Sequence, residues 1–409
     1  MDRADLERLD RDCPLSPCRE RFVLPDGVLY FDGNSLGALP RTAPSSIGEL
    51  VEAEWGGGLI RSWLDAGWFH LARRAGDAIA PLIGASAGEV AVSDSTSVNI
   101  FKLAAALLRG GGRRKVLTES GNFPTDMYIL EGLVDLLGGG RALVRAPPDE
   151  ILDAIDEATA LVVLSHVDYR TGAVLDMEGI AARCKALGVP AIWDLCHSAG
   201  AIPVELNRCG VDYAVGCTYK FLNGGPGAPA FAYVSRDAIG AFEPAVTGWF
   251  GHAEQFRFED RYRPADSIAK CLVGSPPILS LRAVLDGVAC FEGVDMAALA
   301  AKSRRLSDLF IALADERLAR HGLELASPRE AARRGSQVSF RHAHAYAIAR
   351  ALIANDLIPD FRDPDILRFG ITPLYMRHVD VWDAVETIDA VMAGRAWEDF
   401  RTAEREAVT

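Results

Sequence analysis

Short apolar runs alternate with amphipathic stretches through the middle of the chain. Between the apolar runs lie stretches such as residues 176–189, where Asp176 would cap a helix and Gly188 would end it. The alternation predicts an α/β fold with a mostly parallel central sheet flanked by helices. The runs are apolar on both faces, as covered strands should be, and occupy residues 114–120, 141–147, 160–168, 190–196, 213–219 and 229–235.

The pattern changes after about residue 295. A long helical stretch is followed by segments that predict a strand at 336–342, a helix at 343–354 and a strand entering a loop at 366–375. Residues 379–394 would close the chain as a helix. We therefore predict three parts, which are an N-terminal segment 1–60 packed with the small domain, a large domain 61–295 and a small α/β domain 296–409.

The charge balance narrows the possible partners. The chain has 409 residues and a formal net charge of −13, which argues against nucleic acid and anionic membrane. The sequence has no apolar run of about 18 residues and no apolar stretch near its start that would suggest a secretory signal. Its eight cysteines form no C-x-x-C pair and do not cluster with histidines. We predict a cytoplasmic protein without a disulfide framework or a zinc site.

Candidate chemistry lies at the ends of two predicted strands. Asp194 and His197 stand at or just past the end of the strand at 190–196, and Lys220 follows the strand at 213–219. Ligands of parallel α/β sheets bind beyond the strand ends. Pyridoxal phosphate (PLP) needs an acid beside its ring nitrogen and a lysine for its aldehyde. The alternatives are a surface lysine, a helix cap at Asp194 and a core histidine.

Two further segments fit a phosphorylated ring. Thr96 and Ser97 precede an apolar helical run, and hydroxyls with free backbone N–H groups at a helix start bind phosphate. Phe123 would stack on a flat ring, and Asp126 would accept a hydrogen bond from it. The alternatives are a plain capping cluster for the first segment and a turn for the second.

Several motifs together resemble the kynureninase family of fold-type-I PLP enzymes, which is similar to the class V aminotransferases. The resemblance covers about residues 28–390. It is carried by "YFDGNSLGALP" (30–40), "GLIRSWLDAGW" (58–68), "NFPTD" (122–126), "WDLCHSAGA" (193–201), "YKFLNGGPGAP" (219–229), "GWFGH" (248–252), "GSPPILSL" (274–281) and "RFGITPLY" (368–375).

The resemblance implies a PLP-dependent hydrolase of tryptophan catabolism that cleaves the Cβ–Cγ bond of L-kynurenine to give anthranilate and L-alanine. It also implies a homodimer. Lys220, Tyr219 and Asp194 would act in catalysis. The implied cofactor-binding residues are Thr96, Ser97, Phe123, Asp126, Ser165, Asp194, His197, Tyr219, Lys220, Trp249 and Ser275. The implied substrate-binding residues are Arg368, Ser35, Trp63 and His252.

Some of these expectations are more detailed. Trp249 and Ser275 would lie near the phosphate or at the dimer-side wall of the site. Trp63 stands where vertebrate members carry a histidine, which favours kynurenine over 3-hydroxykynurenine. We expect an aromatic pocket formed by Trp63, Trp68, Phe250 and His252. Arg368, in an apolar segment, needs an anion, which is either the substrate α-carboxylate or a nearby Asp363 or Asp365.

The sequence leaves three rival functions to consider. The first is a cysteine desulfurase or a class V aminotransferase of the same fold type. A desulfurase needs a mobile nucleophilic cysteine, for which Cys271 and Cys209 are the least unsuitable. The second is a binding domain that has lost catalysis, which the presence of Lys220, Asp194 and Arg368 argues against. The third is a nicotinamide enzyme, which the lack of a G-x-G-x-x-G motif argues against.

Overall fold

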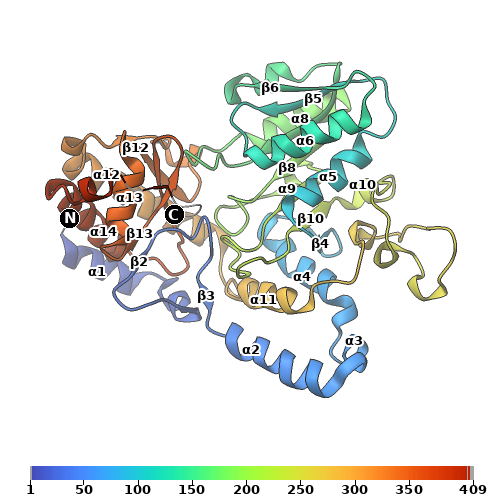
Figure 1. Ribbon diagram of the computed structural model, residues 1–409, viewed down its shortest axis with the longest axis horizontal. Coiled ribbons are helices and arrows are strands. Elements are labelled where there is room, and N and C mark those ends of the chain that lie inside the picture. Colours follow the sequence, from blue (N-terminus) through green and yellow to red (C-terminus); the bar gives the residue numbers. More distant parts are fainter. Residues whose placement is uncertain (1, 403, 406–409) are drawn as a thin grey trace.

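The computed structural model describes residues 2–402 and 404–405, and Figure 1 shows two lobes that lie side by side. The larger lobe is built on a seven-stranded sheet with the strand order β4-β10-β9-β8-β7-β5-β6. β10 runs antiparallel to both neighbours, and the other strands share one direction. The strands are β4 (Val90–Val92), β5 (Lys115–Glu119), β6 (Ala142–Ala146), β7 (Thr159–Ser165), β8 (Ala191–Asp194), β9 (Tyr213–Gly216) and β10 (Phe231–Val234). The predicted mostly parallel α/β sheet is confirmed.

All six predicted strands of the large lobe form, and each ends one to three residues earlier than predicted. β8 ends at Asp194 and β9 ends at Gly216, so that Cys196, Tyr219 and Lys220 lie in the loops that follow. These loops leave the same edge of the sheet because β8 and β9 are parallel neighbours. The edge strand β6 is largely exposed, whereas the prediction had both of its faces covered.

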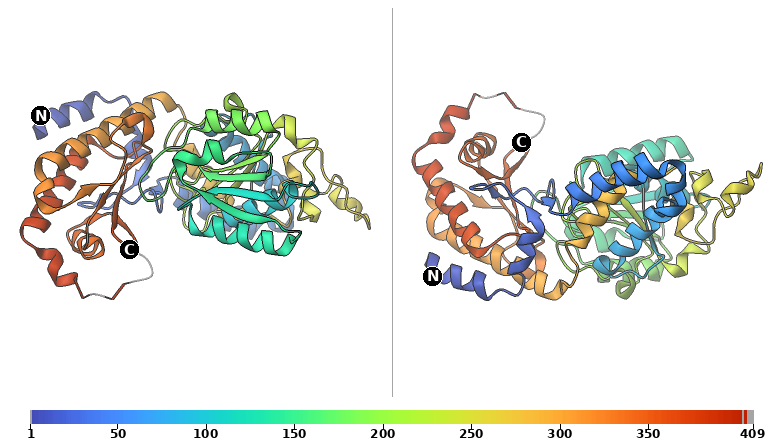
Figure 2. Two further views of the ribbon diagram at one scale, coloured as in Figure 1. Left: turned by 90° about the horizontal axis from the view of Figure 1, so that it is seen from above. Right: turned by 90° about the horizontal axis from the view of Figure 1, so that it is seen from below.

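Helices cover both faces of this sheet (Figure 2). α8 has the predicted ends, because the Asp176 side chain accepts from the Gly179 backbone N–H and Gly188 adopts a left-handed conformation with φ of 59°. The helices of the large lobe are α4 (Leu71–Ile79), α5 (Thr96–Leu107), α6 (Pro124–Leu137), α7 (Ile151–Ala154), α8 (Met177–Leu187), α9 (Leu206–Cys209), α10 (Arg236–Ile239) and α11 (Ile278–Ala289).

The smaller lobe has an antiparallel sheet with the strand order β11-β12-β15-β14. It has its own apolar core, in which the rings of Phe310 and Phe369 meet edge to face. Its strands are β11 (Glu324–Leu325), β12 (Gln337–Arg341), β14 (Asp360–Arg362) and β15 (Ile366–Gly370), and its helices are α12 (Met296–Arg317), α13 (Ala345–Ile353) and α14 (His378–Ala393). The strands and helices predicted beyond residue 295 are therefore present.

The N-terminal segment contacts both lobes. Helix α1 (Arg3–Asp12) packs on α14, and β2 (Leu29–Tyr30) pairs in parallel with β13 (Leu357–Ile358) of the small lobe. Nearby residues join the core of the large lobe instead, among them Cys18 and Phe22. Here β1 (Phe22–Val23) pairs with β3 (Leu39–Pro40). The segment thus connects the lobes, and the exact domain boundaries stay a prediction.

An arm extends from the large lobe at the bottom of Figure 1. It consists of α2 (Ala43–Glu49), a π-helix (Leu50–Gly58) and α3 (Ser62–Asp65), and α2 packs on α11. Glu54 fixes the arm by accepting from Trp68 Nε1 and from Arg282, both at 2.6 Å. In the described residues, no helix combines the length and the apolar character needed to cross a membrane.

Candidate active site

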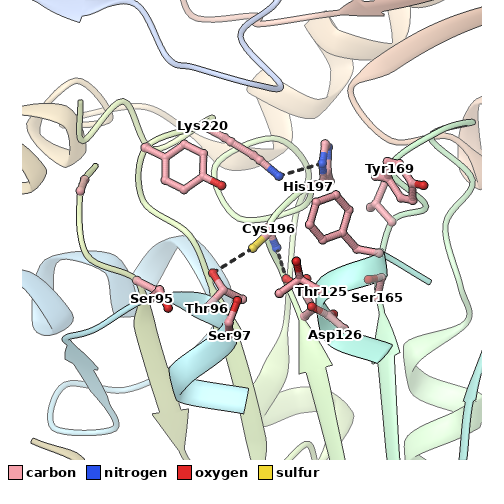
Figure 3. Close-up of a pocket in the computed structure, with 16 residues that line it drawn as sticks. Ser95, Thr96, Ser97, Thr125, Asp126, Ser165, Tyr169, Cys196, His197 and Lys220 are labelled. Carbon is pink, nitrogen blue, oxygen red and sulfur yellow. Dashed lines mark hydrogen bonds between the residues drawn. The ribbon is translucent and has the colours of Figure 1, made fainter. Parts of the chain in front are cut away.

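A cavity of about 240 Å³ opens where the parallel strands of the large sheet end (Figure 3). Sixteen residues line it, and they come from the loops after β7, β8 and β9 and from the first turns of α5 and α6. Nine of the predicted site residues are among them, which are Thr96, Ser97, Phe123, Asp126, Ser165, Asp194, His197, Tyr219 and Lys220. Side chains separated by up to 124 positions in the sequence, from Thr96 to Lys220, therefore meet in one cavity.

Asp194 lies at the floor of the cavity, where β8 ends. It is 6% exposed, and its Oδ1 accepts from the Cys196 backbone N–H at 2.7 Å. The helix-cap alternative is therefore partly right, because the carboxylate does bind a backbone N–H of the next turn. That bond uses one oxygen, and the carboxylate also lines the cavity. A buried carboxylate with spare acceptor capacity needs a further donor or cation.

Lys220 reaches into the cavity from the loop after β9. Its Nζ lies 3.0 Å from His197 Nε2 and 5.9 Å from the centre of the Phe123 ring. The lysine is half-buried, whereas His197 is buried. Burial first, and then the positive charges of Lys220 and two arginines, lower the pKa of His197 well below its ordinary value. A neutral imidazole accepts a hydrogen bond, so His197 orients the Lys220 amine.

Asp126 adds a second carboxyl group to the same cavity. It stands in the first turn of α6 and is 2% exposed. Burial first, and then the charges of Asp194 and Glu119, raise its pKa well above the ordinary value. Its Oδ2 atom is buried and has no hydrogen-bond partner within the described structure. An unpartnered polar atom at a cavity wall is costly unless a ligand satisfies it.

The start of α5 presents hydroxyl groups to the cavity. Ser95 caps the helix by accepting from the Val98 backbone N–H at 3.3 Å, and Thr96 and Ser97 are the first two helical residues. Thr96 Oγ1 lies 3.4 Å from Cys196 Sγ. Free N–H groups and hydroxyls at the start of a twelve-residue helix are the groups that bind an anion, and the phosphate site stays a prediction.

Arg368 lies beside this cavity and already has an internal anion. Its Nη1 donates to the backbone oxygen of Tyr169 at 2.6 Å, and Tyr169 lines the cavity. Its Nη2 pairs with Asp360 and donates to Ser35 Oγ at 3.2 Å. The salt bridge considered for Arg368 therefore exists, but its partner is Asp360 rather than Asp363 or Asp365.

Besides Arg368 and Ser35, four predicted site residues do not line this cavity. Trp249 is 42% exposed, and Ser275 is exposed in the loop before α11. Trp63 packs on Trp68 and on Phe250, with ring centroids 6.0 and 6.2 Å apart, so three of the four residues of the expected aromatic pocket form one cluster. His252 is buried, and its Nε2 lies 3.5 Å from a carboxylate oxygen of Glu259. The aromatic cluster thus forms outside the cavity of its own chain.

Sequence reasoning missed several lining residues. Tyr169 and Thr125 line the cavity, and the edge of the Tyr169 ring meets Phe123 with centroids 5.1 Å apart. Tyr169 follows β7 by four positions, so the strand-end rule that found Asp194 applies to it as well. Cys196, two positions after the end of β8, also lines the cavity. Its thiol pKa is raised by a side-chain hydrogen bond to Cys217 and by burial, so it is a poor nucleophile.

Glu119 is a third carboxyl group behind the site, and it leads to a testable pH dependence. It ends β5, is 6% exposed, and its Oε1 accepts from the Ser165 backbone N–H at 3.0 Å. Burial raises its pKa from 4.5 to about 8, with smaller contributions from Asp168 and Asp194. The folded protein therefore holds a proton that the unfolded chain releases, so the stability from this group is lost as pH rises through about 8.

Glu119→Gln is expected to remove this pH dependence, because glutamine has the shape of the protonated acid. The variant should melt at least about 2 °C above the wild type at pH 9 and close to it at pH 5. Differential scanning fluorimetry across this range measures the effect. Glu150→Gln, at an exposed site, is the control and should follow the wild type. An unchanged pH profile in Glu119→Gln would contradict the raised pKa.

In the described part of the chain, no group of three or more His, Cys, Asp or Glu residues is arranged to hold a metal ion. The cavity presents amine, carboxyl, imidazole and hydroxyl groups. One amine, two carboxyl groups and a helix start with hydroxyls are the donors and acceptors that a phosphorylated pyridine aldehyde requires.

Comparison with solved structures places the fold. The chain matches a cysteine desulfurase from Thermococcus onnurineus NA1 with a TM-score of 0.78, covering 93% of this chain and 98% of that one at 18% identity. It matches a cysteine desulfurase from Escherichia coli with a TM-score of 0.77, covering 93% and 98% at 16% identity. At these identities the likeness concerns the fold alone, and it confirms the predicted class V-like architecture.

Comparison with known sequences identifies the family. Residues 299–388 match the family model described as the kynureninase C-terminal domain. A kynureninase of Burkholderia pseudomallei (strain 1106a) is 49% identical over 413 aligned residues, covering 100% of this chain and 99% of its own. A kynureninase of Pseudomonas fluorescens is 48% identical with the same coverage. This identity extends over the full length of the chain, and Lys220, Asp194 and the first turn of α5 gather in one cavity. The chain therefore belongs to the kynureninase family.

Proposed function

We propose that this chain uses PLP to hydrolyse the Cβ–Cγ bond of L-kynurenine, releasing anthranilate and L-alanine. The observation that carries the proposal is the convergence of Lys220 and Asp194 on one cavity in a chain of this family. Cysteine desulfurase activity is disfavoured because Cys271 is buried and neither it nor Cys209 lines the cavity. The thiol that does line it, Cys196, is held protonated.

The cavity fits the cofactor. Lys220 supplies the amine for its aldehyde, and Asp194 supplies a carboxylate for its ring nitrogen. Thr96 and Ser97 would bind its phosphate at the start of α5. The unpartnered Asp126 Oδ2 would gain a hydrogen-bond donor from the bound ring system. Phe123 would pack on the ring, and Ser165, His197 and Tyr219 would complete the contacts.

When bound, PLP would supply an electron sink for the electrons left at the substrate α-carbon after its proton leaves. Asp194 would keep a proton at the ring nitrogen, which makes that sink effective. Lys220 Nζ would take the α-proton, and His197, 3.0 Å away, would hold the amine in position. The Tyr219 phenol, whose pKa is raised by burial, stays protonated at neutral pH and would donate a proton to the reacting carbon atoms.

Arg368 and Ser35 would hold the α-carboxylate of the substrate. Arg368 Nε is buried without a hydrogen-bond partner among the described residues, so the guanidinium has a donor left after its bonds to Asp360 and Tyr169. Trp63 and His252 would contribute to recognition of the aryl group, with kynurenine preferred over 3-hydroxykynurenine. A cytoplasmic location stays a prediction.

We also propose a homodimer, in which Trp249 and Ser275 would lie at the dimer-side wall. The arm exposes Ile60 by 77% and Leu64 by 80%, and the neighbouring loop exposes Phe258 by 77%. Clusters of large exposed apolar side chains mark protein contacts rather than free surface. Light scattering on the purified protein should give twice the chain mass of 44.1 kDa. A single-chain mass at working concentration would overturn this part of the proposal.

The reaction is tested by offering substrates to one preparation. L-Kynurenine should yield fluorescent anthranilate and an equal amount of L-alanine, and 3-hydroxykynurenine should react more slowly. L-Cysteine should release no sulfide, and L-alanine with a keto acid should undergo no amino transfer. Sulfide release or amino transfer without anthranilate would show that the fold is right and the reaction wrong.

A further inference from the structure

Three charged side chains lie together on one face of the small sheet. Asp360 and Arg362 are two positions apart on β14, so they point to the same face. Arg368 stands directly opposite Asp360 on β15. The fully buried Asp360 carboxylate accepts from Arg362 Nη1 at 2.6 Å through Oδ1 and from Arg368 Nη2 through Oδ2. One carboxylate thus holds two guanidinium groups, and a second carboxyl group, that of Asp32, lies close enough to both arginines to interact with their charges.

The two arginines differ in what they can still bind. The Arg368 side chain is 1% exposed, and its two terminal nitrogens are engaged by Asp360, Ser35 and Tyr169. The Arg362 side chain is 34% exposed. Its bonds to Asp360 and to the Phe361 backbone oxygen, at 2.6 and 2.7 Å, both use Nη1. Arg362 is therefore the more accessible of the two cations.

Arg362 and Arg368 influence the active-site cavity through a hydrogen bond and through their charges. Arg368 bonds the backbone of Tyr169, which lines the cavity. The charges of Arg368 and Arg362, after burial and Lys220, lower the pKa of His197, which lines the cavity as well. Both guanidinium groups therefore lie close enough to the cavity for their charge to be felt there. An anion that enters beside Lys220 therefore meets two arginines of the small lobe, whose charges Asp360 and Asp32 partly offset.

We propose that Arg362 is a second carboxylate-binding residue of the substrate site, and that Asp360 positions both arginines for this purpose. This inference rests on the proposed function, because the ligand is the carboxylate of an amino-acid substrate. Arg368 would offer its buried Nε–H, and Arg362 would offer the N–H groups on its accessible side. Bonds from two guanidinium groups to one carboxylate are charge-assisted and set its orientation.

Kinetics of three variants separate this role from a structural one. Arg362→Gln should raise the KM for L-kynurenine by about 10- to 100-fold, the range of one or two charged hydrogen bonds, and change kcat by less than about threefold. Arg362→Lys should recover part of the lost affinity, because lysine restores the positive charge but not the planar guanidinium group with its several N–H donors. Arg341→Gln is the control, since Arg341 is exposed on β12 of the same sheet, and should leave both constants unchanged.

Calorimetric binding of two small ligands provides a readout that does not need turnover. L-Alanine carries the carboxylate and L-alaninamide does not. Arg362→Gln should weaken binding of L-alanine by about the same factor as the rise in KM, and leave L-alaninamide unaffected. An equal effect on both ligands, or an unchanged KM, would overturn the proposal. If the wild type makes no anthranilate, the proposed reaction is wrong. The binding of L-alanine and L-alaninamide would still test whether Arg362 binds a carboxylate.

Discussion

Lys220→Ala is expected to abolish anthranilate release, with a fall in turnover of about 10²- to 10⁴-fold or more. Lys220 is the one lysine that lines the cavity within the described residues, and its Nζ is held by His197. The wild type should be yellow, and borohydride should fix the cofactor to Lys220. The variant should take up added PLP without a borohydride-stable link. Absorption spectra and peptide mass analysis after reduction measure both effects.

Lys185→Ala is the matched control, because Lys185 is exposed on α8, away from the cavity. It should keep the colour, the label at Lys220 and full turnover. A wild-type protein that stays colourless after incubation with PLP would count against the whole interpretation. A label on a different lysine would keep the cofactor but remove Lys220 from its assigned role.

Asp194→Asn is expected to keep the fold and cofactor uptake but to lower kcat by orders of magnitude. Asparagine Oδ1 can accept the same bond from the Cys196 N–H, so the turn after β8 is preserved. The negative charge that would keep the ring nitrogen protonated is lost, and the electron sink is weakened. Turnover, PLP content and the melting temperature should be measured on the same sample.

Asp176→Asn controls for the general effect of this exchange. Asp176 caps α8 by accepting from the Gly179 N–H at 3.0 Å, and asparagine caps a helix equally well. This variant should retain both stability and turnover. Near-normal turnover of Asp194→Asn would show that its carboxylate serves only as a cap.

The core of the site was predictable because its residues follow a rule of topology. Parallel strands that are neighbours in a sheet end at the same edge, so polar residues after apolar runs converge. Asp194 and Lys220 were found in this way, from the strands before them. The hydroxyls of Thr96 and Ser97 followed from a helix start rather than a strand end. In each case the local pattern fixed the position of the side chain.

The partner of Arg368 was not predictable in the same way. Asp363 and Asp365 are nearer in sequence, but they lie in the turn between β14 and β15. The register of this hairpin sets Asp360 opposite Arg368. Registers depend on strand pairing, which the pattern of one strand does not contain. Trp249 and Ser275 were placed by family resemblance, and a single chain does not bring them to the cavity.

The contacts of the N-terminal segment with distant parts of the chain determine when it can fold during synthesis. Ser35 Oγ donates to Asp360 Oδ2 across 325 positions, and β2 pairs with β13 near the end of the chain. The Gly37 N–H meanwhile bonds the backbone oxygen of Tyr219, next to Lys220. On the ribosome, Ser35 and β2 must wait until residues 357–360 have been made before they find these partners. The large sheet can form during synthesis, but the contacts of Ser35 and Arg368 with Asp360 form only after the small lobe has been made.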